Sequence, residues 1–155
     1  MDPSCLSNTV AALALLCGLG TSPLTPGAAT VPQPDLRGIE TRIDGRIVPA
    51  NRIATAGCAV TVSQDVVNAG DVRSTGTVVR IAAAGGTARL VAVPPLDPGE
   101  AVRVSGTLPL PEGRSVVRVD IDPWDGIGER VEADNITRIA IDAAGCRAGR
   151  RPAGR

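Results

Sequence analysis

Histidine, lysine, phenylalanine and tyrosine are absent from the 155-residue sequence, and Trp124 is its single aromatic residue. Without histidine there is no imidazole base to activate a serine or cysteine nucleophile. The formal net charge is zero, and no set of aromatic side chains is available to stack on single-stranded bases. We therefore expect neither an enzyme nor a partner of nucleic-acid type.

The lack of large aromatic side chains also restricts the core. With 43% hydrophobic residues, the chain has enough apolar material for one folded domain. That core must be built from Val, Ile, Leu and Ala, and β-branched side chains suit a pleated sheet. All sixteen basic residues are arginine, and together with abundant Ala, Gly and Pro this indicates the codon usage of a GC-rich bacterial genome.

Residues 115–142 carry the clearest structural pattern. Apolar residues alternate with polar ones in two runs that are separated by a turn-rich gap, namely Val117, Val119 and Ile121, then Ile139 and Ile141. Period-two alternation is typical of strands that bury one face. The stretch therefore predicts the closing hairpin of a small antiparallel sandwich.

Five further strands are predicted before this hairpin, over residues 36–43, 58–68, 75–83, 87–93 and 101–108. The first has an irregularity at Gly38. In the second, Gln64 falls on the valine face, either as a partner for a buried backbone group or because the strand end is wet. Regular strand spacing with turns between them predicts an all-β sandwich.

The N-terminal residues 1–29 are typical of a signal peptide. Val10–Gly20 is an apolar run too short to span a bilayer, and Gly27 and Ala29 precede the expected cleavage point. Asp2 stands where basic residues are usual, and a disordered apolar N-terminus or a lipid on Cys17 are the alternatives. Residues 30–33 then form a linker, 34–143 the folded domain, and 144–155 a basic disordered tail.

Four sequence motifs resemble the CARDB family, the cell-adhesion-related domain found in bacteria. They are Pro34-Asp35-Leu36, the Val-x-Asn-x-Gly of residues 66–70, the Leu-x-Pro-Gly-Glu of residues 96–100, and a final hairpin with Val119-Asp120, Glu129, Glu132 and Asn135. The resemblance covers residues 34–142. It implies a seven-stranded immunoglobulin-like sandwich in a secreted or surface protein, acting as a spacer or adhesive module without a reaction. Asp134 departs from the Asn-Asn usual before the last strand.

In that immunoglobulin-like topology, the second strand starts at the end of the sandwich where the last strand finishes. Cys58 opens the second strand and Cys146 follows the last, so we expect a disulfide between them, whereas Cys5 and Cys17 would leave with the signal peptide. The alternative is two unpaired small hydrophobic residues. A zinc site is not expected, because the two cysteines lack close spacing.

Six acidic residues lie between positions 120 and 134. Asp120, Asp122 and Asp125 could supply oxygens to a Ca²⁺ ion, although Asp side chains more often cap turns by accepting backbone N–H groups. Trp124 is either an exposed contact for sugar or protein or, more often in such a place, packs back over an end of the sandwich. The basic tail either touches anionic envelope polymers or is inert.

We therefore predict a secreted or cell-envelope structural or adhesion-type interaction module, whose partner is a protein or an envelope polymer. It requires no cofactor and has no transmembrane segment once the signal peptide is removed. The alternative is an extracellular module that binds Ca²⁺ or glycan through the loop at residues 120–135.

Overall fold

The computed structural model describes residues 31–48, 52–144 and 146. The predicted signal peptide and most of the predicted tail lie outside these residues. The described part contains nine strands and no helix that could cross a membrane. The strands are β1 (Leu36–Ile43), β2 (Arg46–Ile47), β3 (Arg52–Thr55), β4 (Ala59–Asn68), β5 (Thr77–Ala83), β6 (Ala88–Val93), β7 (Ala101–Pro109), β8 (Gly113–Ile121) and β9 (Ile136–Ala143).

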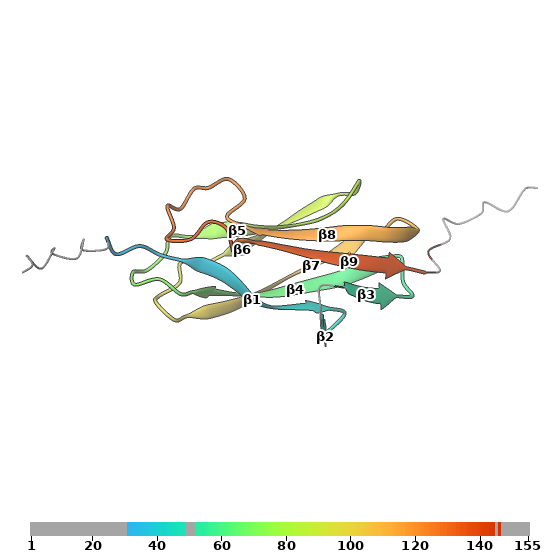
Figure 1. Cartoon of the computed structure of the whole chain (residues 1–155), viewed down its shortest axis with the longest axis horizontal. Helices are drawn as coiled ribbons and strands as arrows, with labels where there is room; N and C mark the ends of the chain where they lie inside the picture. Colours follow the sequence, from blue (N-terminus) through green and yellow to red (C-terminus); the bar gives the residue numbers. More distant parts are fainter. Residues whose placement is uncertain (1–30, 49–51, 145, 147–155) are drawn as a thin grey trace, which may run out of the picture. The chain divides into compact units, whose positions relative to one another are not determined.

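The strands form two sheets that face each other, as Figure 1 shows. One sheet has the order β2-β1-β4-β7 and the other the order β3-β9-β8-β5-β6. The all-β prediction is confirmed, and each of the seven predicted strands has a counterpart. The count of seven strands is wrong, because the described residues also form the short strands β2 and β3, and β3 pairs with β9 in parallel.

The core between the sheets is aliphatic, as the absence of Phe and Tyr predicts. Its buried side chains are Leu, Ile, Val and Ala together with Cys146. The alternation seen in the sequence places Val117, Val119 and Ile121 of β8 inward, each at most 3% exposed. Ile139 and Ile141 of β9 are likewise buried, so the pattern of the closing hairpin was interpreted correctly.

The polar exception on the valine face of β4 has a local explanation. Gln64 is 1% exposed and lies opposite Thr41, next to the irregularity in β1 where the register shifts between Gly38 and Glu40. A Cβ at Gly38 would lie 2.5 Å from the Gln64 amide nitrogen. The Gln64 amide accepts a hydrogen bond from the Thr41 hydroxyl and donates one to the Asp65 carbonyl. The Gln64 side chain therefore fills the space that the bulge leaves.

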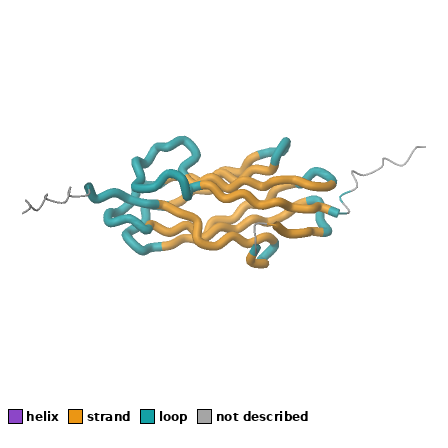
Figure 2. Tube along the Cα trace, in the orientation of Figure 1, coloured by secondary structure: helices purple, strands orange, loops and turns teal. Residues whose placement is uncertain are grey.

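The connections gather at the two ends of the sandwich (Figure 2). We call one end the loop pole: it comprises the start of β1 and the loops at residues 69–76, 94–100 and 122–135. The opposite end carries the β5–β6 and β7–β8 turns, the start of β4 and the end of β9. The candidate acidic loop and the candidate disulfide therefore lie at opposite poles.

Candidate functional site

Asn68, the last residue of β4, ties the loop pole together. It is fully buried, and its Oδ1 accepts hydrogen bonds from the backbone N–H groups of Asp35, at 3.2 Å, and Gly70, at 3.0 Å. Its Nδ2 donates to the carbonyls of Val72, at 2.8 Å, and Leu96, at 2.9 Å. One side chain thus satisfies backbone groups from three loops or strand ends, which leaves the pole little freedom to rearrange.

Asp122 organises the start of the long loop between β8 and β9. Its Oδ2 accepts a hydrogen bond from the Ile127 N–H at 2.8 Å, and its Oδ1 accepts one from the Thr77 hydroxyl at 2.7 Å. Asp122 and Asp125 both have positive φ, 46° and 54°, a conformation that Asp tolerates better than most residues. The bonds of Asp122 are those of a turn residue, as the capping interpretation of this loop predicts.

Glu129 joins the same loop to the first strand. Its side chain is 7% exposed, and its Oε1 accepts a hydrogen bond from the Leu36 N–H at 3.2 Å. Its Oε2 accepts a short hydrogen bond from the Asn135 amide, and Glu132 accepts from the same amide and from the Glu129 N–H. Glu129 thus connects the start of β1 to the residue before β9.

Burial raises the pKa of Glu129 to about 7, against the two hydrogen bonds that favour its charged form. The nearby carboxylates of Glu132 and Asp122 raise the pKa further. A raised carboxyl pKa is also a feature of general acids. Here both oxygens of Glu129 are bonded within the protein, and among the described residues no serine, threonine or cysteine is bonded to the carboxylate. Its bonding therefore indicates a structural role.

The three residues of the candidate Ca²⁺ site are engaged separately. Asp120 is 3% exposed and pairs with Arg118, Asp122 bonds Thr77 and Ile127, and Asp125 is exposed. Within the part of the chain that the structure describes, no three His, Cys, Asp or Glu side chains converge in a way that could hold a metal ion. All three nevertheless line one hollow of about 150 Å³ together with Glu132, Asn135 and the arginines Arg80 and Arg118.

Two oxygens that belong to residues lining this hollow are buried without a protein partner. They are Asp120 Oδ2 and Asn135 Oδ1, neither of which accepts a hydrogen bond from a described residue. Buried polar atoms are rarely left unpaired. Asp120 Oδ2 and Asn135 Oδ1 therefore lack the partners that buried polar atoms usually have.

Trp124 does not cover the end of the sandwich. Its side chain is 67% exposed, beside a hollow of about 340 Å³ that Thr75–Val78 and residues 126–127 also line. The favoured interpretation, that this tryptophan packs back over the domain, is therefore wrong. An exposed contact for a sugar or protein remains the prediction for this residue.

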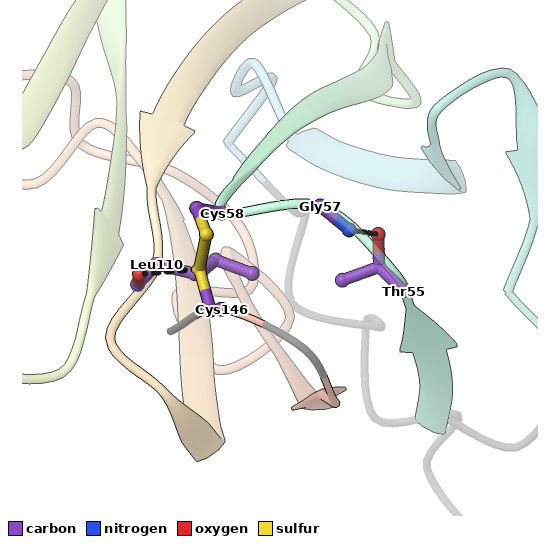
Figure 3. Close-up of a disulfide and its surroundings, with 5 residues drawn as sticks. All are labelled: Thr55, Gly57, Cys58, Leu110 and Cys146. Atoms are coloured by element: carbon purple, nitrogen blue, oxygen red, sulfur yellow. Dashed lines mark hydrogen bonds between the residues drawn. A yellow bond between two sulfur atoms is a disulfide. The ribbon is translucent and has the colours of Figure 1, made fainter. Parts of the chain in front are cut away.

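The opposite pole carries the disulfide, shown in Figure 3. Cys58 and Cys146 are bonded, with their Cα atoms 4.8 Å apart and a separation of 88 positions in the sequence. The Leu110 N–H donates to the Cys58 carbonyl at 2.8 Å, and the Cys146 sulfur lies 3.6 Å from the Leu110 carbonyl oxygen. The bridge thus fastens the segment that follows β9 to the residue before β4, a strand of the other sheet.

The outer face of the five-stranded sheet carries one feature that the sequence does not predict. Five exposed arginines project there, from four neighbouring strands: Arg52, Arg80, Arg114, Arg118 and Arg138. The alternation with buried residues already placed Arg118 and Arg138 outward. The five arginines lie close together only because of the strand register and the presence of β3, and the sequence pattern predicts neither.

Two facing sheets with a buried aliphatic core, closed at one end by a disulfide, define a small β-sandwich module of the immunoglobulin-like class. The chain belongs to the CARDB family, whose profile matches residues 44–138, more than half of the sequence. The resemblance found in the four motifs is thereby confirmed. A comparison with curated proteins finds no match.

Solved structures with the same fold include CARDB domains. A crystal structure of a CARDB domain from Pyrococcus furiosus, in complex with di-metal ions, has a TM-score of 0.58 at 21% identity. The match covers 74% of this chain and 96% of that domain. A solution structure of a domain from a proposed cell surface protein of Methanosarcina acetivorans has a TM-score of 0.56 at 16% identity, over 76% of this chain and 98% of that domain.

Proposed function

We propose that this chain is a secreted or cell-surface module that binds a protein or an envelope polymer and catalyses no reaction. The observation that carries the proposal is its CARDB sandwich, with both sheets formed and loops and sheet faces exposed. The M. acetivorans relative is a domain of a proposed cell surface protein, which supports the same placement. An adhesion-type or structural role is the function that such a module serves.

The disulfide supports the extracellular placement. Disulfides form and persist in oxidising compartments and are rare where cytosolic thiol systems keep cysteines reduced. Cys58 and Cys146 are bonded in the structure, and the apolar run before the domain has the length of a signal-peptide core. Both features suit a chain that is exported.

The chemistry of the buried acids supports a role without catalysis. Glu129 has a raised pKa, but its oxygens bond Leu36 and Asn135 rather than a nucleophile. The sequence contains no histidine that could act as a base in its place. The polar groups of the loop pole are instead used to hold the loops.

Sedimentation of the purified chain with isolated envelopes of the source cells tests the proposal. We expect saturable co-sedimentation that added unlabelled protein competes away. Recovery of the protein in the supernatant at every envelope concentration would contradict it. A heat-denatured sample of the same chain serves as the control for nonspecific trapping.

A second candidate is an extracellular module that binds Ca²⁺ through the loop at residues 120–135. It is supported by the unpaired buried oxygens of Asp120 and Asn135, and the P. furiosus relative was crystallised with di-metal ions. Hard cations favour such carboxylate and carbonyl oxygens. The exposed Trp124 on the same loop is the contact that the glycan form of this candidate would use.

Calorimetric titration with Ca²⁺ distinguishes the candidates. Binding heat that disappears in Asp120→Asn but remains in Asp97→Asn, an exposed carboxylate outside the loop, would favour the cation site. An absence of both heat and a change in melting temperature would eliminate it and leave the interaction module unaffected.

A further inference from the structure

The outer face of the five-stranded sheet is strongly basic in an otherwise acidic body. Residues 30–146 hold twelve arginines and fifteen acidic residues, a net charge of −3. The outward positions of β3, β5, β8 and β9 hold five arginines, namely Arg52, Arg80, Arg114, Arg118 and Arg138, against two carboxylates, Asp120 and Asp142. GC-rich composition explains arginine in place of lysine, but it does not explain this concentration on one face.

Strand register arranges four of these residues in one diagonal line, which we call the arginine track. Arg118 of β8 lies directly opposite Arg138 of β9. Arg80 of β5 lies opposite Asp120, two positions along β8 from Arg118. Arg52 of β3 lies opposite Ala140, two positions along β9 from Arg138. The arginine track therefore crosses four adjacent strands, a width of roughly 15 Å at the usual strand spacing.

This arrangement is unfavourable for folding. Like charges directly opposite each other on antiparallel strands are destabilising, and Arg118 and Arg138 are such a pair. Asp120 is bonded to Arg118, but Arg52, Arg80 and Arg138 form no salt bridge with any described residue. The fold gains nothing evident from these three guanidinium groups, which leaves their donors available to a ligand.

The outer face of the other sheet shows what a balanced surface looks like in the same protein. There Arg103 makes two hydrogen bonds of 2.6 Å to Asp65, and Arg42 pairs with Glu40. The Arg103 guanidinium lowers the pKa of Asp65 below its ordinary value. Arg103 and Arg42 of that face are thus paired with carboxylates, whereas three of the four arginines of the arginine track are not paired with any described residue.

A hollow of about 350 Å³ adjoins the arginine track at Arg52. Ala84, Val116 and Ala140 line it with small apolar surface, and its charged lining residues are Arg52, Arg114 and Asp142. Asp142 pairs with Arg114 at 4.0 Å, so within the described part of the chain Arg52 is the unpaired cation of the hollow. No aromatic residue lines this hollow. Planar guanidinium groups match carboxylates and phosphates, which accept two parallel hydrogen bonds. The small apolar lining of the hollow suits the ring of a sugar, and the guanidinium groups of the arginine track suit the carboxylates that acidic sugar rings carry.

We propose that the arginine track and its adjoining hollow bind an acidic, carboxylate-bearing polysaccharide that lies across β5, β8, β9 and β3. The inference rests on the proposed function and names the partner class of the interaction module. A repeating anionic polymer fits because charges recur along the track, whereas a single small anion would use one or two arginines. Because the contacts are between charged groups, the affinity for the polysaccharide should fall as added salt screens the guanidinium groups.

The test uses the full chain and polygalacturonate as the probe, with its methyl-esterified form as the uncharged match. Biolayer interferometry compares the wild type with two double variants that remove equal charge. Arg80→Gln with Arg138→Gln removes half of the track, whereas Arg37→Gln with Arg46→Gln removes two exposed arginines of the other sheet.

We expect the track variant to bind polygalacturonate about tenfold more weakly or worse, and the control variant to stay within about twofold of wild type. The esterified polymer should bind weakly to all three proteins. Arg138→Gln alone should leave the melting temperature unchanged or raise it, because it relieves the repulsion from Arg118. A lowered melting temperature together with unchanged binding would show a structural role and overturn the proposal.

Three other results would also overturn it: no binding of polygalacturonate by the wild type, equal losses in both double variants, or equally tight binding of duplex DNA or of phosphatidylglycerol vesicles. Envelope sedimentation distinguishes failure of the polysaccharide proposal from failure of the proposed function. If wild type and track variant sediment equally with envelopes, the proposed interaction module is supported and the polysaccharide inference is wrong. If the wild type does not sediment, the proposed function itself is wrong.

Discussion

The backbone N–H of Leu36 donates a hydrogen bond to Glu129 Oε1 at 3.2 Å, across 93 positions of sequence. Leu36 begins the first strand, and Glu129 lies in the loop before the last one. Backbone bonds between Arg130 and Pro34 and between Ala69 and Asp35 add to this connection. The start of the domain is thus held by polar groups at the loop pole, while the disulfide holds its other end.

Replacing Glu129 with Gln should change how stability depends on pH. Because the pKa of Glu129 is raised to about 7, the folded state binds its proton more tightly than the unfolded state does. This group therefore makes the protein less stable as pH rises from about 4.5 to 7, by roughly 3 kcal/mol in total. Urea unfolding of wild type and Glu129→Gln across this range measures the effect.

Glutamine mimics the protonated acid, so the variant should gain stability relative to wild type as pH rises. Glu112→Gln, an exposed residue of the β7–β8 turn, provides the control and should show no such trend. A constant difference between Glu129→Gln and wild type from pH 4.5 to 8 would contradict the raised pKa.

Asn68→Ala should destabilise the protein by about 3 kcal/mol or more, because two buried N–H groups and two carbonyls lose their partner. Ser63→Ala, on the outer side of the same strand, removes one exposed hydroxyl contact and should cost less than about 0.5 kcal/mol. Chemical unfolding of both variants measures this. Similar losses for the two variants would show that the Asn68 network contributes little.

Gly70→Ala should also destabilise the loop pole, by at least about 2 kcal/mol. A Cβ at Gly70 would lie 2.3 Å from the Gln33 carbonyl oxygen and 2.6 Å from the Asp35 nitrogen, so backbone would have to move. Gly128→Ala is the matched control, since a Cβ there has no neighbour within 4 Å. Thermal unfolding should leave the control unchanged, and an unchanged Gly70→Ala would contradict the close approach.

Removing the disulfide should lower the free energy of unfolding by roughly 4–5 kcal/mol, the chain-entropy value for a closed loop of this length. The bridge joins residues 88 positions apart. The measurement compares a Cys5→Ser, Cys17→Ser background with the same protein carrying Cys58→Ala and Cys146→Ala. Reductant should destabilise the first protein and leave the second unchanged. Equal stability of both would show that the bridge has no thermodynamic role.

The long strands could be predicted because each displays its alternation over many residues. Buried residues recur at every second position along most of β4, β8 and β9. A turn can be predicted where its residue types tolerate positive φ, as Asp44 and Gly45 do between β1 and β2. β2 and β3 could not be predicted, since runs of two and four residues are too short to show a period. The parallel pairing of β3 with β9 joins segments that are distant in sequence, so no local pattern predicts it.

The candidate sites were predictable only in part. Asn68 was identified in a motif, but two of its four bonds reach Asp35 and Leu96, which are distant in sequence. The acidic loop was visible, whereas the burial of Glu129 depends on its contact with Leu36. The arginine track needed the register of four strands, which alternation within one strand does not specify.

The most direct test of the central claim is thiol trapping combined with fractionation in the source cells. The chain should be recovered outside the cytoplasmic membrane, shortened by the predicted signal peptide, with Cys58 and Cys146 unreactive toward maleimide until reductant is added. Recovery of the intact chain in the cytosol with both cysteines alkylated would contradict an exported, disulfide-closed interaction module.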